Sequence, residues 1–548
     1  MLLLPNQRFN RRPWFFLHPL RGPDNHKSQN SRQKQEKKER RRSRATAPLL
    51  FCRYTITSFV FLSTGKPEFF AKPLGNLFPF LYDGLAMMRF KREPVRTTSI
   101  TEGSIAKGLL LFFFPILFGS FFQQMYNVAD AIIVGRFIGK EALAAVGGGT
   151  SVFVNLLVGF FVGITNGASV VISQHFGANE KDKTHLSIQT SMVMSFIGGV
   201  IVMALGLSTS KWAMRLIATP DDILDMSVTY LDIFFLGMIP MFLYNMSASA
   251  LRSMGDSKRP LYILILGCLV NILLDVLFVA VFRWGVAGAA WATVGCETIS
   301  AMLGIYFLRH NGDKSNCFSF HGMGINGPIC RKMLYLGIPA GIQGSMYSIS
   351  NIIIQGSINS LGTNIIAANA AYGKVDTLFW MCINSFGVAM TVFSGQNYGA
   401  SQFQRVRKGT WVCLGMSSLM SVLFSVIFLT WGRSFLSLFT TDATVLDDGV
   451  TILRCVAPFF ITWVSIEILS GTIRGCGQSV VPTLLTVFGV CVLRIFWVAF
   501  YFPTHHTIQT VMYIYPISWS VTSVLFWIYY AAGHWMAREL REKQDLAA

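Results

Sequence analysis

The sequence predicts an all-α polytopic membrane protein with twelve transmembrane helices in two pseudo-symmetric six-helix bundles. Of the 548 residues, 52% are hydrophobic and only 13% are charged, whereas a soluble globular chain usually carries about 25% charge. Apolar segments long enough to cross a bilayer alternate with short polar loops, and the second half of the chain repeats the pattern of the first. This composition argues against a cytosolic enzyme, a secreted disulfide-linked scaffold and a nucleic-acid-binding protein.

The chain opens with a basic segment, residues 1–88, which holds 16 Lys and Arg and 5 Asp and Glu, a net +11 of the total +19. A basic arm can bind RNA or anionic lipid. We favour the simpler interpretation of a disordered extension, or of upstream sequence translated in error. Met87 and Met88 precede several basic residues and the first long apolar run, which is a normal start for an inner-membrane protein.

From residue 109 onward, apolar segments must be helices, because a helix satisfies its own backbone hydrogen bonds in lipid. We expect them near Leu109–Val134, Ser151–Gln174, Thr190–Leu207, Thr229–Leu251, Leu261–Phe282, Val286–Leu308, Leu334–Asn359, Ala367–Gly395, Trp411–Trp431, Leu453–Ile473, Pro482–Phe502 and Met512–Gly533. They divide the chain into an N-lobe (89–310), a cytoplasmic inter-lobe linker (311–333), a C-lobe (334–535) and a cytoplasmic tail (536–548).

The charge of the loops predicts the topology. Loops after even-numbered spans, through the tenth, hold 13 Lys and Arg, whereas loops after odd-numbered spans hold 6. Cytoplasmic loops carry the excess of basic residues. Both termini are therefore expected in the cytoplasm, with the protein in the plasma (inner) membrane of a prokaryote.

The two halves match at a nearly constant offset of about 222 residues. The matching pairs are Met125–Gly135 with Met346–Gly356, Ile172–Ala178 with Ser394–Ala400, and Leu251–Pro260 with Ile473–Pro482. Each unit contains six spans, and an even number restores the same orientation, so the halves are parallel repeats. Two such bundles leave a cleft in which alternating access can expose a cavity to either side.

Buried acidic residues in the predicted spans are costly and usually functional. Asp130 lies in the first span, and Asn271 and Asp275, four residues apart, share one face of the fifth. With Thr293 they could offer oxygen ligands to a hard cation such as Na⁺. The carboxyl groups could instead bind protons near neutral pH. The alternatives are polar contacts that hold helices together and, for Thr293, a bond to its own backbone.

Other polar residues in the spans are candidates for a substrate cavity. They are Gln123, Tyr126, Asn245, Glu297, Asn351 and Glu467. Glu467 could contact a cationic substrate or pair with Arg494 on the next helix, and Lys374 and Asp376 could neutralise each other. Pro115 and Pro339 lie in the first helix of each half, where each removes a backbone donor and can kink the helix.

The chemistry of an enzyme is missing from the sequence. No Walker A motif indicates ATP as the driving force, and no metal-ligand motif or nucleophile elbow is found. We therefore predict a protein that is not an enzyme and needs no cofactor. The rival functions are a lipid-linked precursor flippase, which would need a more basic cavity, and a membrane enzyme or receptor scaffold.

The first span, QQMYNVADAIIVGRFIGKEALAAVG, and the segment GASVVISQHFGA resemble the multidrug and toxic compound extrusion (MATE) transporters, in particular the DinF-like prokaryotic branch. The resemblance covers residues from about 103 to 535, and Asn271, Asp275 and GVAGAAWATV with Thr293 fall in the same register. Asn351 stands in the seventh span where some relatives have Asp, so the sequence lacks that acidic group in the second half.

The resemblance implies two six-helix lobes and the export of cationic, lipophilic compounds by antiport with Na⁺ or H⁺. It also implies a cation-coupling site at Asp130, Asn271, Asp275 and Thr293. The expected partners are small cationic substrates and the lipid bilayer, with no nucleic acid, and we expect a monomer.

Overall fold

The structure is a computed structural model that describes residues 100–217, 219–310, 324–533 and 535; the extension, most of the linker and the tail predicted from sequence lie outside these ranges. All regular elements in the described ranges are helices. The first group is α3 (Ile105–Phe137), α4 (Lys140–Gly147), α5 (Gly149–Gly177), α6 (Lys181–Leu216), α7 (Asp221–Leu236), α8 (Met238–Ser253), α9 (Lys258–Asp275), the π-helical η2 (Val276–Val281) and α10 (Val286–Arg309).

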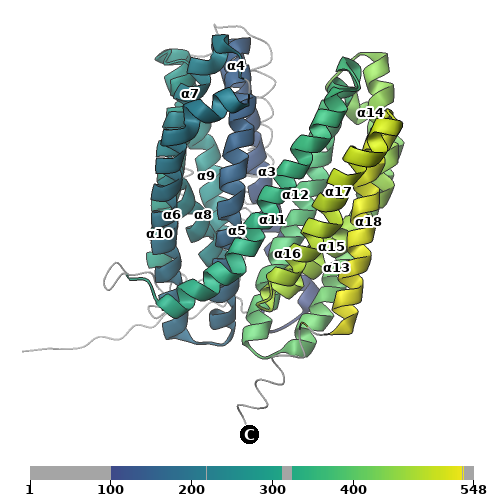
Figure 1. Ribbon diagram of the computed structural model, residues 1–548. Helices are drawn as coiled ribbons and strands as arrows, with labels where there is room; N and C mark the ends of the chain where they lie inside the picture. Colours follow the sequence, from purple (N-terminus) through teal and green to yellow (C-terminus); the bar gives the residue numbers. More distant parts are fainter. Residues whose placement is uncertain (1–99, 218, 311–323, 534, 536–548) are drawn as a thin grey trace, which may run out of the picture. The chain divides into compact units, whose positions relative to one another are not determined.

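The second group repeats the first. It comprises α11 (Gly327–Asn359), α12 (Thr363–Gly399), α13 (Phe403–Leu436), α14 (Ala443–Val456), η4 (Ala457–Phe459), α15 (Phe460–Gly475), α16 (Val480–Thr486), η5 (Val487–Val492), α17 (Leu493–Phe496), η6 (Trp497–Tyr501), η7 (Phe502–Thr504) and α18 (Ile508–Ala532). Figure 1 shows the groups as two bundles, α3 to α10 and α11 to α18. The predicted fold class is therefore confirmed.

The membrane spans agree with the predicted segments, apart from their ends. Ten helices or continuous helical runs in the described ranges are long and apolar enough to cross a membrane. An eleventh span is formed by α7 and α8, which are bent by 49° where they meet. The seventh predicted segment is α11, which is not among these eleven; its first turns contain Arg331 and Lys332, and it begins at Gly327, earlier than the predicted Leu334. The length of the apolar run therefore predicted too short a helix.

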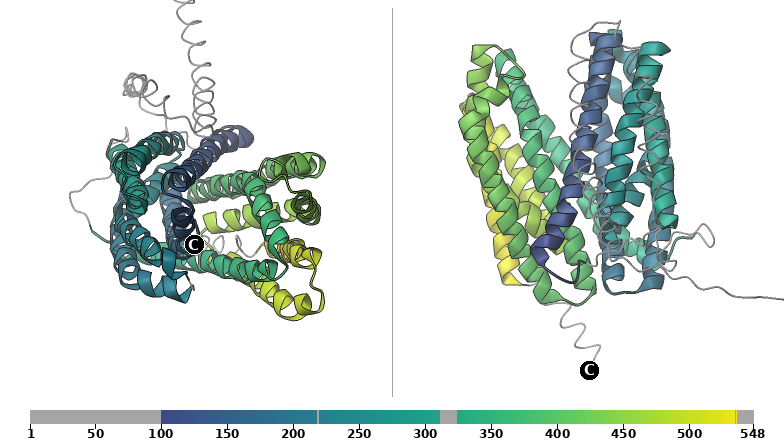
Figure 2. Two further views of the ribbon diagram at one scale, coloured as in Figure 1. Left: turned by 90° about the horizontal axis from the view of Figure 1, so that it is seen from above. Right: turned by 180° about the vertical axis from the view of Figure 1, so that it is seen from behind.

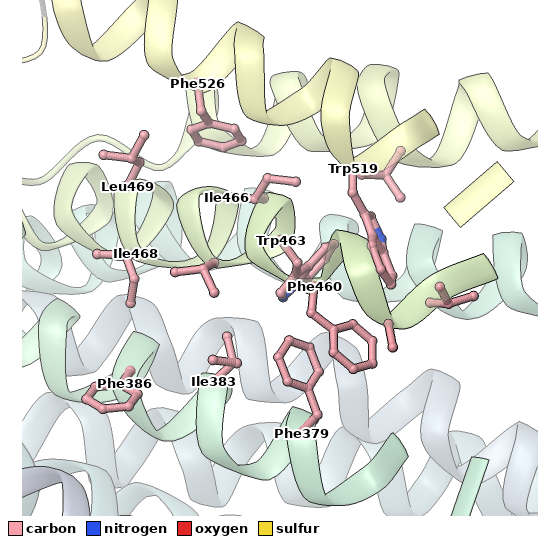
Figure 3. Packing of buried hydrophobic residues seen from close by; sticks show 14 of the residues in the cluster. Phe379, Ile383, Phe386, Phe460, Trp463, Ile466, Ile468, Leu469, Trp519 and Phe526 are labelled. Atoms are coloured by element: carbon pink, nitrogen blue, oxygen red, sulfur yellow. The ribbon is translucent and has the colours of Figure 1, made fainter. Parts of the chain in front are cut away.

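A core of aromatic and branched side chains holds the C-lobe together. Phe379 of α12 stacks on Phe460 of α15 with ring centroids 3.9 Å apart, and Trp519 of α18 lies beside Trp463. Figure 3 shows these rings between the three helices. Burying one such ring stabilises a fold by a few kcal/mol in water, whereas in lipid its contribution comes from close packing.

The first helix of each lobe begins in the core of the other lobe. Leu109, Phe112 and Phe113 of α3 belong to the C-lobe core, and Phe113 stacks on Phe386 of α12 at 3.9 Å. In the same way, the start of α11, with Met333, packs into the N-lobe core. The rear view in Figure 2 shows the start of α3 running among the C-lobe helices. The lobes are thus joined by exchanged helical segments.

Both prolines that were predicted to kink their helices lie near the points where these helices pass between lobes. Pro115 lies within the part of α3 that packs against the C-lobe core, since Ile116 and Leu117 also contact it, and Pro339 follows the part of α11 that packs in the N-lobe. Each stands inside a continuous helix. Because proline cannot donate a backbone hydrogen bond, these are the points at which α3 and α11 bend most easily.

Glycines allow α5 and α11 to cross with their backbones in contact. A Cβ added at Gly163 would lie 2.1 Å from the Gly341 nitrogen, and one at Gly167 would lie 2.5 Å from the Gly337 nitrogen. Real Cβ atoms do not approach a backbone so closely, so only glycine fits at these positions. Small residues are the usual means by which membrane helices pack tightly.

Candidate functional site

Two acidic side chains of the N-lobe lie close together. Asp130 lies on α3 and is half-buried, whereas Asn271 and Asp275 lie one turn apart on α9 and are fully buried. The carboxyl groups of Asp130 and Asp275 are close enough to interact electrostatically. The structure therefore places Asp130 close to Asp275, with Asn271 one turn away on α9, which are three of the four side chains that the sequence analysis had grouped.

The polar atoms of this group lack hydrogen-bond partners. They are Asp130 Oδ1, both carboxylate oxygens of Asp275, and Oδ1 and Nδ2 of Asn271. In the described part of the chain, no ion pair includes either carboxylate. Buried polar atoms without partners are costly. A proton or a hard cation, which prefers oxygen ligands, would satisfy this arrangement.

The backbone around this site is irregular. The α-helix ends at Asp275 and continues as the π-helical η2, and wide turns of this kind often occur at functional sites. On α10, the Thr293 hydroxyl donates to its own helix at Ala289 O, 3.2 Å away. Within the described ranges, no three His, Cys, Asp or Glu side chains form a metal-binding cluster. Na⁺ would therefore need amide and hydroxyl oxygens beside the two carboxylates.

Tyr230 of α7 belongs to the same site but was missed in the sequence. It is buried, and its hydroxyl interacts electrostatically with both Asp130 and Asp275. A tyrosine in an apolar helix is equally suited to packing, so its position in the chain carries no signal. Tyr230 reaches the acidic pair because α7 packs beside α3 and η2, where Tyr230 shares a hydrophobic cluster with Ile133 and Val279.

Of the other N-lobe candidates, Tyr126 interacts with both Gln123 and Glu297. Glu297 of α10 interacts with the hydroxyls of Tyr126 and Tyr244, and one of its oxygens is buried without a partner. Gln123 lies beside Tyr126, whereas the Asn245 amide donates to Met241 O on its own helix at 2.9 Å. Among the described residues that line the large cavity, Gln123, Tyr126, Asn245 and Glu297 do not occur.

The large cavity has a volume of about 830 Å³ and lies between the lobes. Its walls come from α5 and α8 of the N-lobe and mainly from α11, α12, α15, α17 and α18 of the C-lobe. Asn351 and Glu467, two of the predicted cavity residues, line it, together with Trp380, Trp463 and Trp519. A cavity of this size with aromatic walls suits flat, apolar small molecules.

Charged residues of the C-lobe face this cavity in an arrangement that differs from the prediction. Asp376 is buried and accepts a hydrogen bond from the Trp380 indole nitrogen at 2.5 Å, whereas Lys374 is exposed. The predicted neutralisation of Asp376 by Lys374 is therefore wrong. Arg494 is held by Asn351 and Ser518, so the predicted alternative of a Glu467–Arg494 pair does not occur among the described ion pairs.

One end of the cavity is closed by a symmetric pair of hydrogen bonds between the lobes. Gln174 Nε2 at the end of α5 donates to Gly475 O at 2.9 Å, and Gln396 Nε2 at the end of α12 donates to Ser253 O at 2.7 Å. Gln174 and Gln396, like Ser253 and Gly475, differ by the repeat offset of 222. We call this pair the glutamine clasp.

Close backbone contact accompanies the clasp. A Cβ added at Gly177 would lie 1.9 Å from Gln396 O, and one at Gly399 would lie 2.0 Å from Gln174 O. Lys332 of α11 also donates to Gln174 Oε1 at 3.0 Å. The lobes therefore touch directly at the end that carries the loops after the even-numbered spans.

A family model described as MatE matches residues 115–277 and again residues 339–499, more than half of the chain. The chain belongs to the MATE family. This family consists of transporters and not of enzymes, and the double match agrees with the internal repeat. The prediction of a multi-pass multidrug efflux transporter is confirmed.

Individual relatives extend the likeness over most of the chain. The probable multidrug resistance protein YoeA of Bacillus subtilis is 28% identical over 455 residues, covering 81% of this chain and 97% of YoeA. An FAD transporter of Shewanella oneidensis is 23% identical over 354 residues, covering 64% and 77%. A crystal structure of a MATE protein in the bent conformation matches with a TM-score of 0.75 and 21% identity, covering 83% of this chain and all of that one.

Proposed function

We propose that this transporter exports cationic, lipophilic compounds in exchange for Na⁺ or H⁺ moving inward. The proposal rests above all on Asp130 and Asp275, two carboxyl groups that interact in the N-lobe and have oxygens without hydrogen-bond partners. A mobile cation is the simplest partner for them. Asn271 and Thr293 would complete an oxygen site for Na⁺.

The cation can act only by binding more tightly to one orientation of the cavity than to the other. One elementary charge moving through 100 mV is worth about 2.3 kcal/mol, which would support a substrate gradient of roughly fortyfold. An exchange of one monovalent cation for another gains nothing from the voltage. With two carboxyl groups, the site could take up more than one cation for each substrate exported. Such an exchange would move net charge and would gain free energy from the voltage.

The substrate would occupy the cavity between the lobes. Trp380, Trp463 and Trp519 provide an apolar, aromatic surface, and Glu467 provides a carboxylate for a cationic group. The names of several relatives, such as YoeA, refer to multidrug resistance. These features support a broad range of aromatic cations as substrates.

We also propose an orientation. The end closed by the glutamine clasp carries loops rich in Lys and Arg, which favour the cytoplasm. With that end inside the cell, the structure corresponds to an outward-facing state in a prokaryotic plasma membrane. Both termini would be cytoplasmic, and a monomer would suffice because each chain contains both lobes.

Accumulation of the fluorescent cation rhodamine 123 in cells tests the proposal. Cells that express the wild type should exclude the dye, whereas Asp130→Asn and Asp275→Asn should lose most of this exclusion because neither amide can exchange a proton or balance a cation. Asp182→Asn, at an exposed position at the start of α6, is the matched control. Replacing Na⁺, or collapsing the pH gradient, identifies the coupling ion.

Two results would contradict the proposal. Equal and efficient exclusion by wild type, Asp130→Asn and Asp275→Asn would refute the assignment of the coupling site. A failure of the wild type to exclude any of several aromatic cations, with the protein present in the membrane, would refute drug export.

A further inference from the structure

A buried arginine in the C-lobe has partners that are all neutral. Arg494 lies in α17 and is only 3% exposed. Its Nε donates to Ser518 Oγ at 3.1 Å, and Nη1 donates to Asn351 Oδ1 at 3.4 Å. The guanidinium lies over the Tyr515 ring, 4.5 Å from the centroid. These contacts fix its position without neutralising its charge.

An uncompensated charge at this depth is expensive. In the described ranges, the ion pairs do not include Arg494, and burying a lone ion costs several kcal/mol even after relaxation. A guanidinium has five N–H donors, and the hydrogen bonds to Ser518 and Asn351 use Nε and Nη1 but not Nη2. Arg494 lines the large cavity, so a ligand there can reach it.

The two acidic groups of the same cavity do not pair with Arg494 among the described ion pairs. Asp376 accepts the hydrogen bond from Trp380. Glu467 packs over Gly387 and interacts electrostatically with Arg474, which lines the same cavity. Arg494 is therefore a positive group of the cavity wall that neither acid neutralises, and Arg252 and Arg474 line the same cavity.

We propose that Arg494 forms an anion subsite in the substrate cavity, which binds the carboxylate of zwitterionic aromatic compounds. The inference rests on the proposed export function and extends its substrates beyond pure cations. The planar guanidinium suits the planar carboxylate. The ring system of the ligand would lie against Trp380, Trp463 or Trp519, and its cationic group would face Glu467 or Asp376.

A matched pair of dyes tests the subsite. Rhodamine 110 carries a free carboxylate, and rhodamine 123 is its methyl ester with the same cationic ring system. Binding of each dye is measured by fluorescence polarisation with the full chain in phosphatidylcholine nanodiscs. The variants are Arg494→Gln, Arg494→Lys and, as the control, Arg433→Gln, whose arginine pairs with Asp447 at the exposed end of α13 outside the cavity.

Arg494→Gln should weaken rhodamine 110 binding about tenfold or more, which corresponds to about 1.4 kcal/mol. Rhodamine 123 binding should change no more than about twofold, which also shows that the variant is folded. Arg494→Lys keeps the positive charge but not the planar guanidinium. Its affinity for rhodamine 110 should therefore lie between those of the wild type and Arg494→Gln. Arg433→Gln should leave both affinities unchanged.

The inference is overturned if Arg494→Gln weakens both dyes equally, if it weakens neither, or if the wild type fails to bind rhodamine 110. Nanodiscs that contain phosphatidic acid provide a further arm. Displacement of rhodamine 110 by this lipid only when Arg494 is present would assign the subsite to a lipid phosphate and would also overturn the inference. Failure of the wild type to exclude any of several aromatic cations would instead refute the proposed function.

Discussion

The glutamine clasp makes a quantitative prediction about the balance between the two orientations of the cavity. The perturbation is the double substitution Gln174→Ala and Gln396→Ala. Each side chain contributes a hydrogen bond that joins the lobes at one end, and both bonds are buried. When the lobes separate at that end, these bonds break. The substitutions should therefore destabilise the closed end and favour the opposite orientation.

The size of the effect follows from the contacts. A buried hydrogen bond contributes about 0.5–1.5 kcal/mol net, and a partner left unsatisfied costs about 1–3 kcal/mol. At about 1–2 kcal/mol for each bond, the pair contributes about 2–4 kcal/mol. Since about 1.4 kcal/mol changes an equilibrium tenfold, the double variant should shift the population ratio roughly 30- to 700-fold. Gln396→Ala alone should give about half of this free energy.

Thiol labelling measures the shift. Asn166 of α5 lines the cavity and is partly exposed, so Asn166→Cys places a thiol there, in a chain whose cysteines at 52, 317 and 330 are replaced by serine. A membrane-impermeant maleimide is applied to vesicles of each orientation. From the side of the closed end, labelling of the double variant should be at least tenfold faster than labelling of the parent.

Gln478→Ala is the matched control for the clasp. Gln478 lies at the same end but hydrogen-bonds to Tyr529 and Trp535 within the C-lobe alone. It should leave the labelling rate unchanged. An unchanged rate in the double variant, or an equal increase in the control, would refute the role of the clasp.

Two further predictions concern packing and capping. Gly163→Ala should cost about 1–3 kcal/mol of stability, because its Cβ would meet Gly341, whereas Gly159→Ala on the same helix meets nothing within 4 Å; equal melting temperatures in detergent would contradict this. Hydrogen bonds from Thr444 and the start of α14 lower the pKa of Asp442. Its folded pKa lies below the unfolded value, so Asp442→Ala should lower the melting temperature at neutral pH, and the difference should shrink as pH falls below about 4. A difference independent of pH would exclude the carboxylate as its cause.

Most of the fold was visible in the sequence because lipid imposes simple rules. Spanning segments must be long, apolar and helical, and matching blocks at one offset revealed two lobes. The start of α11 was missed because Arg331 and Lys332 interrupt the apolar run, although Lys332 is used to contact Gln174. The sequence does not predict that the starts of α3 and α11 pack in the opposite lobe, because this packing produces no periodic pattern of apolar residues.

The candidate site was predicted only in part. Asp130, Asn271 and Asp275 could be grouped because their cost in lipid marks them and their spacing defines a face. The position of Tyr230 depends on how α7 packs, which the sequence does not reveal. Asp376 was interpreted as part of a local charge pair because Lys374 is its near neighbour in sequence, but residues two apart on a helix do not face each other.

The exchanged starts of α3 and α11 bear on how the protein is made. Residues such as Phe113 leave the ribosome early, yet Phe386, on which Phe113 stacks, is synthesised some 270 residues later (386 − 113 = 273). The first helix therefore cannot reach its final neighbours until most of the second lobe has been inserted. Membrane insertion can begin at once, but final assembly has to wait until nearly the whole chain has been made. If the two halves were produced separately, each would carry one helix whose core contacts form only when the other half is present.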